Sequence, residues 1–223
     1  MFNVVRGDAD AAIKSNSAYL TIHGLAAGDR TICDKYNRFP EFWTLNTFAL
    51  QTTFFIASGR LFDARRDSYS IHKLVEATIA NPAFFSKAAL RERKRQASGI
   101  TGADPQWLLD YLNEAWEPTT ADLQPFRTAL APHTRKFAAI YQPIRHKVYA
   151  HRSIEDAMAI TALFDKTVIS DVAEILRFLH SLLCAIREMA WNARRPDLTD
   201  FADYEAFVTS LNRKTEGFIR QLP

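Results

Sequence analysis

A short basic segment, residues 141–152, holds the side chains of this chain that are best suited to chemistry. It reads YQPIRHKVYAHR and carries three cations and two imidazoles: Arg145, Lys147, Arg152, His146 and His151. A helix end needs only one or two cations to complement the negative end of its dipole. The segment therefore indicates a use beyond helix capping.

These residue types could cleave RNA without a metal ion. The guanidinium of Arg145 offers a fork of donors that fits two phosphodiester oxygens, and His146 and His151 can move protons near neutral pH. One imidazole would take the proton of a ribose 2′-hydroxyl, which attacks its own phosphorus while Arg145 stabilises charge on the phosphoryl oxygens. Such acid–base help contributes roughly 10²–10⁴-fold, and the products would be a 2′,3′-cyclic phosphate and a 5′-hydroxyl.

The spacing of the two main groups raises a geometric question. At about 100° per residue, Arg145 and His151 lie roughly 120° apart around an unbroken helix, whereas Arg145, Tyr149 and Arg152 share a face. Either the helix unwinds before His151, or the site is shared with a second subunit across a two-fold axis. We favour the second arrangement, because pairing two such segments doubles the cation density that faces a phosphate.

Two other interpretations use the same residues. The basic residues are also typical of a solvated helix end, and a histidine is more often structural than catalytic. A metal site is disfavoured, because His146 and His151 are one residue too far apart to be two ligands on one helical face.

The elements that position the segment are predicted to be helices, because helical spacing dominates and strand-like alternation is nearly absent. We predict an all-α antiparallel helical bundle, in which a central helix begins at Pro40 and the segment ends a long helix capped by Thr120. Pro132 and Pro143 should break or kink that helix. The other expected features are a first helix over 8–25, a turn over 32–36, helices opened by Ser70, Ser86, Pro105 and Thr199, and the longest helix over 167–194.

The composition is that of a globular protein. The 223 residues are 48% hydrophobic and 24% charged, with a net charge of +3, which favours a single domain, 1–223, with a mild preference for anionic partners. Cys33 and Cys184 form no paired or metal-binding framework, so we expect reduced thiols and a cytoplasmic location. We expect no signal peptide and no membrane span.

The stretch over 82–118 is expected to be a small helical insertion. Its basic run, 91–95, is typical of a solvated face, and the alternative is a track for an RNA backbone. The insertion either clips onto the bundle or covers the cleft.

The sequence RHKVYAH at 145–151 resembles the signature of the HEPN superfamily, which is Arg, then Asn, Asp or His, then four residues, then His. The ending AHR is similar to the abortive-infection (AbiU2-like) branch. The stretch GRLFD at 59–63 and the pair Ser70–Ile71 are also similar to that branch. The resemblance covers most of the chain loosely, but 82–118 not clearly.

The resemblance implies an all-helical homodimer with a metal-independent endoribonuclease site in the interface cleft, acting as a toxin-like or phage-defence effector on RNA. It needs no cofactor, and an antitoxin protein is a candidate further partner. HEPN toxins with a nucleotidyltransferase antitoxin usually have a tyrosine where this chain has Ser153, which argues against that mode of regulation. The resemblance implies a catalytic group of Arg145, His146 and His151, and we expect substrate binding by Tyr149, Arg152, Lys147 and Arg60.

A non-catalytic function stays open beside this one. HEPN proteins include RNA-binding and scaffold members, so the same segment could bind RNA or a nucleotide without chemistry, or hold a regulatory dimer together.

Overall fold

The structure, a computed structural model, describes residues 1–65, 67–150 and 157–222. All regular elements of these residues are helices, which confirms the predicted all-α class. In chain order they are α1 (Phe2–Gly28), α2 (Arg30–Asn37), α3 (Pro40–Leu61), α4 (Ile71–Ala80), η1 (Pro82–Phe85), α5 (Lys87–Ala97), α6 (Gln106–Glu114), α7 (Thr120–Leu123), α8 (Pro125–Lys136), η2 (Phe137–Tyr141), α9 (Gln142–Ile144), η3 (Arg145–Ala150), α10 (Ala157–Phe164), α11 (Ile169–Asn192) and α12 (Ala202–Arg220).

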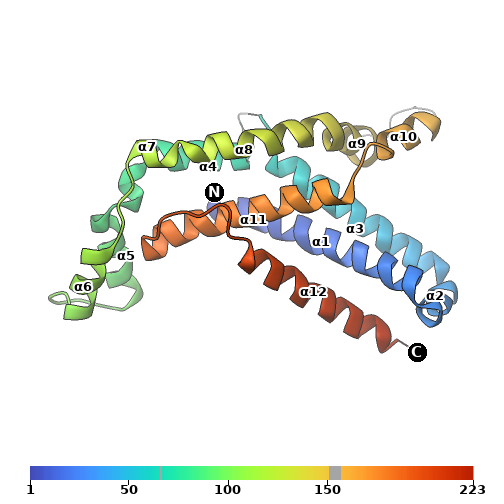
Figure 1. Cartoon of the computed structure of the whole chain (residues 1–223), viewed down its shortest axis with the longest axis horizontal. Coiled ribbons are helices and arrows are strands. Elements are labelled where there is room, and N and C mark those ends of the chain that lie inside the picture. Colours follow the sequence, from blue (N-terminus) through green and yellow to red (C-terminus); the bar gives the residue numbers. More distant parts are fainter. Residues whose placement is uncertain (66, 151–156, 223) are drawn as a thin grey trace.

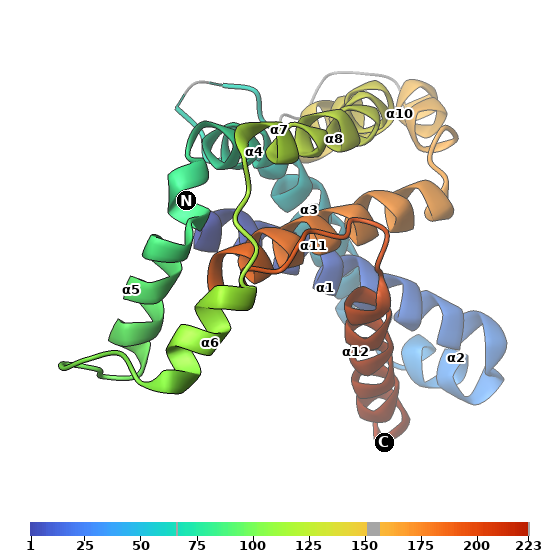
Figure 2. The same cartoon turned by 60° about the vertical axis from the view of Figure 1, so that its left-hand side comes forward.

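The long helices form an elongated antiparallel bundle (Figure 1). Helices α1 and α3 run in opposite directions side by side, and α11 crosses the middle of the bundle (Figures 1 and 2). The rod formed by α8, η2, α9 and η3 lies along one edge, where η3 packs against α3. Helix α12 covers the opposite side and packs on α1 and α11. The motif segment is thus held against α3, the helix whose end leads into 62–63.

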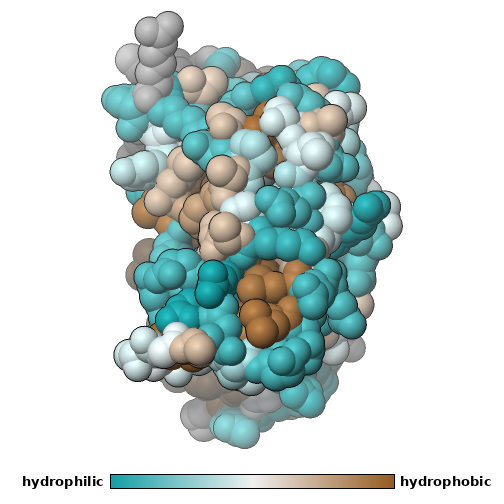
Figure 3. Space-filling view, turned by 90° about the vertical axis from the view of Figure 1, so that its left-hand side faces the viewer, coloured by the Kyte–Doolittle hydropathy of each residue, from teal (hydrophilic) through white to brown (hydrophobic). Residues whose placement is uncertain are grey.

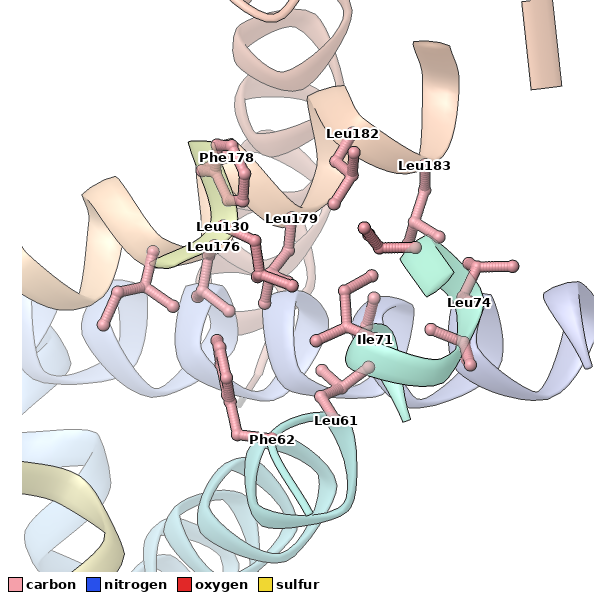
Figure 4. Close-up of a cluster of buried hydrophobic side chains, with 14 of the residues drawn as sticks. Leu61, Phe62, Ile71, Leu74, Leu130, Leu176, Phe178, Leu179, Leu182 and Leu183 are labelled. Carbon is pink, nitrogen blue, oxygen red and sulfur yellow. The ribbon is translucent and has the colours of Figure 1, made fainter. Parts of the chain in front are cut away.

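One large buried cluster supplies the core. It joins the end of α3, the start of α4, the inner face of α8 and the middle of α11, where leucine and phenylalanine side chains interdigitate above α1 (Figure 4). In α1 the small residues Ala9 and Ala12 are almost fully buried, which lets neighbouring helices approach closely. Since apolar burial is the main stabilising term in folding, this cluster supports the proposal that residues 1–223 form one domain.

Local signals set several helix ends as expected. Pro40 is the first residue of α3. Ser70 accepts a hydrogen bond from the backbone N–H of Lys73, and Ser86 accepts one from that of Ala89, so both serines cap the helices that they precede. These caps satisfy N–H groups that have no partner inside the helix.

Several expectations about the elements were wrong. Thr119 rather than Thr120 caps α7, since it accepts a hydrogen bond from the backbone N–H of Asp122. The first helix extends beyond the expected 8–25 at both ends. The stretch over 32–36 lies in α2 rather than in a turn, because Asp29 caps that helix by accepting from the N–H groups of Thr31 and Ile32. Among the described helices α1, with 27 residues, is longer than α11, with 24. The last helix begins after Phe201, since Thr199 instead bonds to the carboxylate of Asp197.

The stretch over 82–118 forms η1, α5 and α6 and clips onto the end of α11. The basic residues of 91–95 make contacts within the protein. Arg91 and Arg95 both pair with Asp104 of the following loop, Arg93 donates to the carbonyl of Ala190, and Lys94 lies over the ring of Tyr111. These contacts help to hold the insertion together, while Arg91 stays 54% exposed, and the alternative role of 91–95 as a track for RNA stays a prediction.

No helix within the described ranges combines the length and the apolar character that crossing a membrane requires.

Candidate functional site

A pocket of about 480 Å³ lies between the end of α3 and the helical rod that carries the motif. The residues that line it come from two separate stretches of the chain: Gly59, Phe62, Asp63, Ala64, Arg65, Phe137, Gln142, Arg145 and His146. The stacked rings of Phe62 and Phe137, with centroids 4.5 Å apart, form its apolar wall. The pocket therefore brings the start of the motif to the second stretch that the sequence singled out.

The rod that carries Arg145 continues as a helix through Pro143, so the expected break at this proline does not occur. The backbone stays helical from α8 through η3, but on both sides of Pro143 it winds into wider π-helical turns. The N–H of Gln142 donates to the carbonyl of Phe137, five residues back. Proline has no N–H and crowds the carbonyl four residues before it, so the wider turns accommodate Pro143 where an ordinary α-helix would be strained. Short π turns of this kind are frequent at functional sites.

Arg145 reaches the pocket across the surface of α3 at Gly59. A Cβ atom at Gly59 would lie 2.5 Å from Nε of Arg145 and 2.8 Å from its Cδ, so only glycine leaves room for this side chain. The Nε atom is buried and has no hydrogen-bond acceptor among the described residues. Packing therefore orients the guanidinium more than hydrogen bonding does.

Asp63 and Arg65 form the opposite side of the pocket. The side chain of Arg65 donates to Asp63 at 3.0 Å, and its backbone N–H donates to the same carboxylate. These hydrogen bonds from Arg65 hold the pKa of Asp63 below its usual value, and the positive charge of Arg145 lowers it further. With two guanidinium groups and one carboxylate, the pocket has an excess of positive charge that suits a phosphate.

His146 lies next to Arg145 in the pocket wall. The amide nitrogen of Gln142 is 3.4 Å from Nε2 of His146, and it donates to that atom when the imidazole is neutral with its proton on Nδ1. Gln142 thus gives the ring a preferred orientation and tautomer. Arg145 and His146 both line the pocket, and their catalytic roles stay predictions.

Tyr149 is turned towards α3. Its ring stacks on Phe55, and its hydroxyl donates to Oε1 of Gln51 at 3.3 Å. Burial raises the pKa of Tyr149 to about 12, so the hydroxyl keeps its proton. Packing accounts for these contacts, and the role of Tyr149 in substrate binding stays a prediction.

Arg60 and Lys147 do not line the pocket. Arg60 is 62% exposed and pairs with Asp8 of α1 at 3.4 Å, and Lys147 is half-buried on η3. His151 and Arg152 lie outside the described residues. Their predicted roles stay predictions.

The pocket also contains groups that the sequence did not single out as site residues. Arg65 lines the pocket, whereas Arg60, which was expected to bind substrate, does not, and Gln142 contacts His146. The basic pair at 65–66, two residues after Asp63, was the available signal for Arg65. Gln142 lies four residues before His146, a spacing at which side chains on a helix meet, so it could have been found from the sequence.

A second pocket, larger than the one at Arg145, has a different character. An apolar pocket of about 760 Å³ is lined by α4, η1, the start of α1 and the end of α11, and Arg187 supplies its only charged side chain. It lies at the end of the molecule that Figure 3 presents, where hydrophobic residues are exposed among hydrophilic ones. Within the described ranges, no three His, Cys, Asp or Glu side chains gather as a metal site. Of these two pockets, the one at Arg145 contains the arginine and histidine of the motif.

The sequence that forms this pocket matches a known protein family. Residues 16–158, more than half of the chain, match the HEPN family described as AbiU2. The matched range includes α3, the pocket residues and the whole motif. No curated protein and no solved structure matches the chain.

Proposed function

We propose that this chain, which belongs to the AbiU2 family of HEPN proteins, is a metal-independent endoribonuclease that acts as a toxin-like or phage-defence effector. The observation that carries the proposal is the position of Arg145, whose side chain enters a pocket beside His146 and opposite Arg65. The pocket combines a donor fork for a phosphate with an imidazole for proton transfer.

In the proposed reaction Arg145 binds the scissile phosphate. An imidazole takes the proton of the ribose 2′-hydroxyl, the 2′-oxygen forms a bond to phosphorus, and the bond from phosphorus to the 5′-oxygen breaks. A second imidazole gives a proton to that leaving oxygen. His151 acts as base or acid, His146 supplies or orients the other proton, and Arg145 stabilises the extra negative charge as the bonds change.

An exposed apolar face supports a site shared by two copies of the chain. In the first half of α3, Phe42, Leu45 and Phe48 are 57%, 66% and 52% exposed. This face adjoins the motif, since Phe48 lies 6.0 Å from Tyr149 of η3, measured between ring centroids. Contiguous exposed apolar side chains mark interaction sites. A second copy that covers this face would bring two motif segments together.

The test uses the purified protein, RNA and a chelator. We expect cleavage that leaves a 2′,3′-cyclic phosphate and a 5′-hydroxyl, and loss of that cleavage in His151→Ala with an unchanged melting temperature. His23→Ala, which alters an exposed histidine of α1, is the matched control and should cleave normally. Binding without cleavage across several RNA types would overturn the nuclease and favour a non-catalytic RNA-binding dimer.

A further inference from the structure

The contact between Gly59 and Arg145 is closer than any side chain at position 59 would permit. Besides the contacts of a Cβ with Nε and Cδ, the Cγ atom of Arg145 would be only 3.1 Å away. Carbon atoms in good packing lie about 3.5–4.0 Å apart. A Cβ atom at any of the other glycines would meet no neighbouring atom within 4 Å beyond its own stretch of chain. The close approach of another side chain is therefore particular to Gly59.

The backbone gives no other reason for a glycine here. Gly59 lies within α3, and the only described glycine with a positive φ is Gly99. Glycine is less favourable than alanine inside a helix. Gly59 therefore destabilises α3 locally. Its missing side chain leaves a gap that the aliphatic part of Arg145 fills.

This gap sets the direction of the arginine. Arg145 makes no ion pair with a described carboxylate, and its buried Nε has no acceptor there. The carboxylate of Asp63, which senses the positive charge of Arg145, is already bound by Arg65. The side chain is thus aimed by the shape of α3, which leaves its guanidinium available for a ligand.

We infer that Gly59 is a positioning residue for Arg145, and its effect on RNA cleavage rests on the function proposed above. A methyl group at position 59 would push Nε and Cδ away and turn the guanidinium out of the pocket. Removing the arginine side chain would make the same methyl group harmless.

The experiment compares the full-length wild type with Gly59→Ala, Arg145→Ala and the double variant. We expect Gly59→Ala to lower the melting temperature when Arg145 is present and to raise it in the Arg145→Ala background, where alanine only improves the helix. Gly217→Ala is the control, because this glycine of α12 has open space around it and should give a shift of the same sign in both backgrounds. Shifts of one sign for Gly59→Ala in both backgrounds would overturn the inference.

Cleavage gives the second readout. Gly59→Ala should lose at least about tenfold in cleavage rate, and it should lose nothing further in the Arg145→Ala background. A wild type that cleaves no RNA would overturn the proposed function, while the reversed shift in melting temperature would still support the positioning role. If Gly59→Ala alone does not fold, recovery of folded protein in the double variant supports the inference, and failure of both contradicts it.

Discussion

The ring of Tyr149 lies nearly parallel to that of Phe55, with the two centroids 4.7 Å apart and the planes 13° apart. This stacking fixes η3 to α3 in the middle of the motif, between Arg145 and the residues that follow. Tyr149 therefore has a structural role in the segment, because its ring packs η3 against α3.

The stacking predicts different outcomes for two substitutions of Tyr149. Tyr149→Phe keeps the ring and loses one hydrogen bond, so it should cost about 1 kcal/mol of stability or less and leave cleavage intact. Tyr149→Ala removes the ring and should cost about 3 kcal/mol. Urea unfolding and RNA cleavage measure both effects. Loss of cleavage in a stable Tyr149→Phe protein would instead show that the hydroxyl binds substrate.

The wide helical turns around Pro143 predict that replacing this proline raises stability and lowers activity. Pro143→Ala restores an N–H and lets the rod wind as an ordinary α-helix, which would gain up to about 3 kcal/mol. The tighter winding would rotate Arg145 away from Gly59, so cleavage should fall although the protein melts at a higher temperature.

Pro132 provides the matched control, since it lies inside α8 before the motif. Pro132→Ala should also raise the melting temperature but leave cleavage unchanged. Full activity in Pro143→Ala would show that the π turns do not aim the arginine.

Buried histidines predict a loss of stability in mild acid. Burial lowers the pKa values of His72, His133 and His180 below the ordinary value of 6.5. The unfolded chain therefore binds protons at these imidazoles before the folded chain does, and stability should fall as pH drops below about 6.5. The midpoint of urea unfolding at pH 7.5, 6.5 and 5.5 measures the effect.

His133 offers a way to check the cause. It stacks on Phe178, and burial outweighs the opposing influence of Glu174 on its pKa. His133→Phe keeps the ring contact and should reduce the dependence of stability on pH. An unfolding midpoint that rises from pH 7.5 to 5.5 would contradict the account.

Asp104 should be essential to the insertion and irrelevant to the site. Its carboxylate binds Arg91 and Arg95 of α5. Asp104→Ala leaves the two cations without this partner, so proteolysis and hydrogen exchange in 98–105 should become faster. Because the insertion packs on α11 and does not line the pocket at Arg145, RNA cleavage should not change. Reduced cleavage would assign the insertion a part in binding RNA.

The features that sequence analysis predicted well are those that depend on neighbouring residues. The caps at Ser70 and Ser86 and the start at Pro40 need only the next turn of helix, and the spacing of apolar residues gave the all-α class. The motif also directed attention to Arg145 and His146, which both line the pocket.

The features that it missed depend on distant contacts. Whether Arg60 or Arg65 enters the pocket is decided by how α3 ends and where the chain then turns. The pairing of Arg91 and Arg95 in α5 depends on Asp104, which lies in the loop after that helix. The rod continues through Pro143 because its neighbours can widen the helix, which local propensity does not foresee.

The most direct test of the central claim, a nuclease site shared by two copies of the chain, is complementation between inactive variants. Arg145→Ala and His151→Ala are each inactive in the proposal, but a mixed dimer would contain one site with both residues intact. After an equal mixture exchanges subunits, about a quarter of wild-type cleavage should return, because half of the dimers are mixed and each has one intact site of two. A mixture that forms mixed dimers but stays inactive would contradict the shared site.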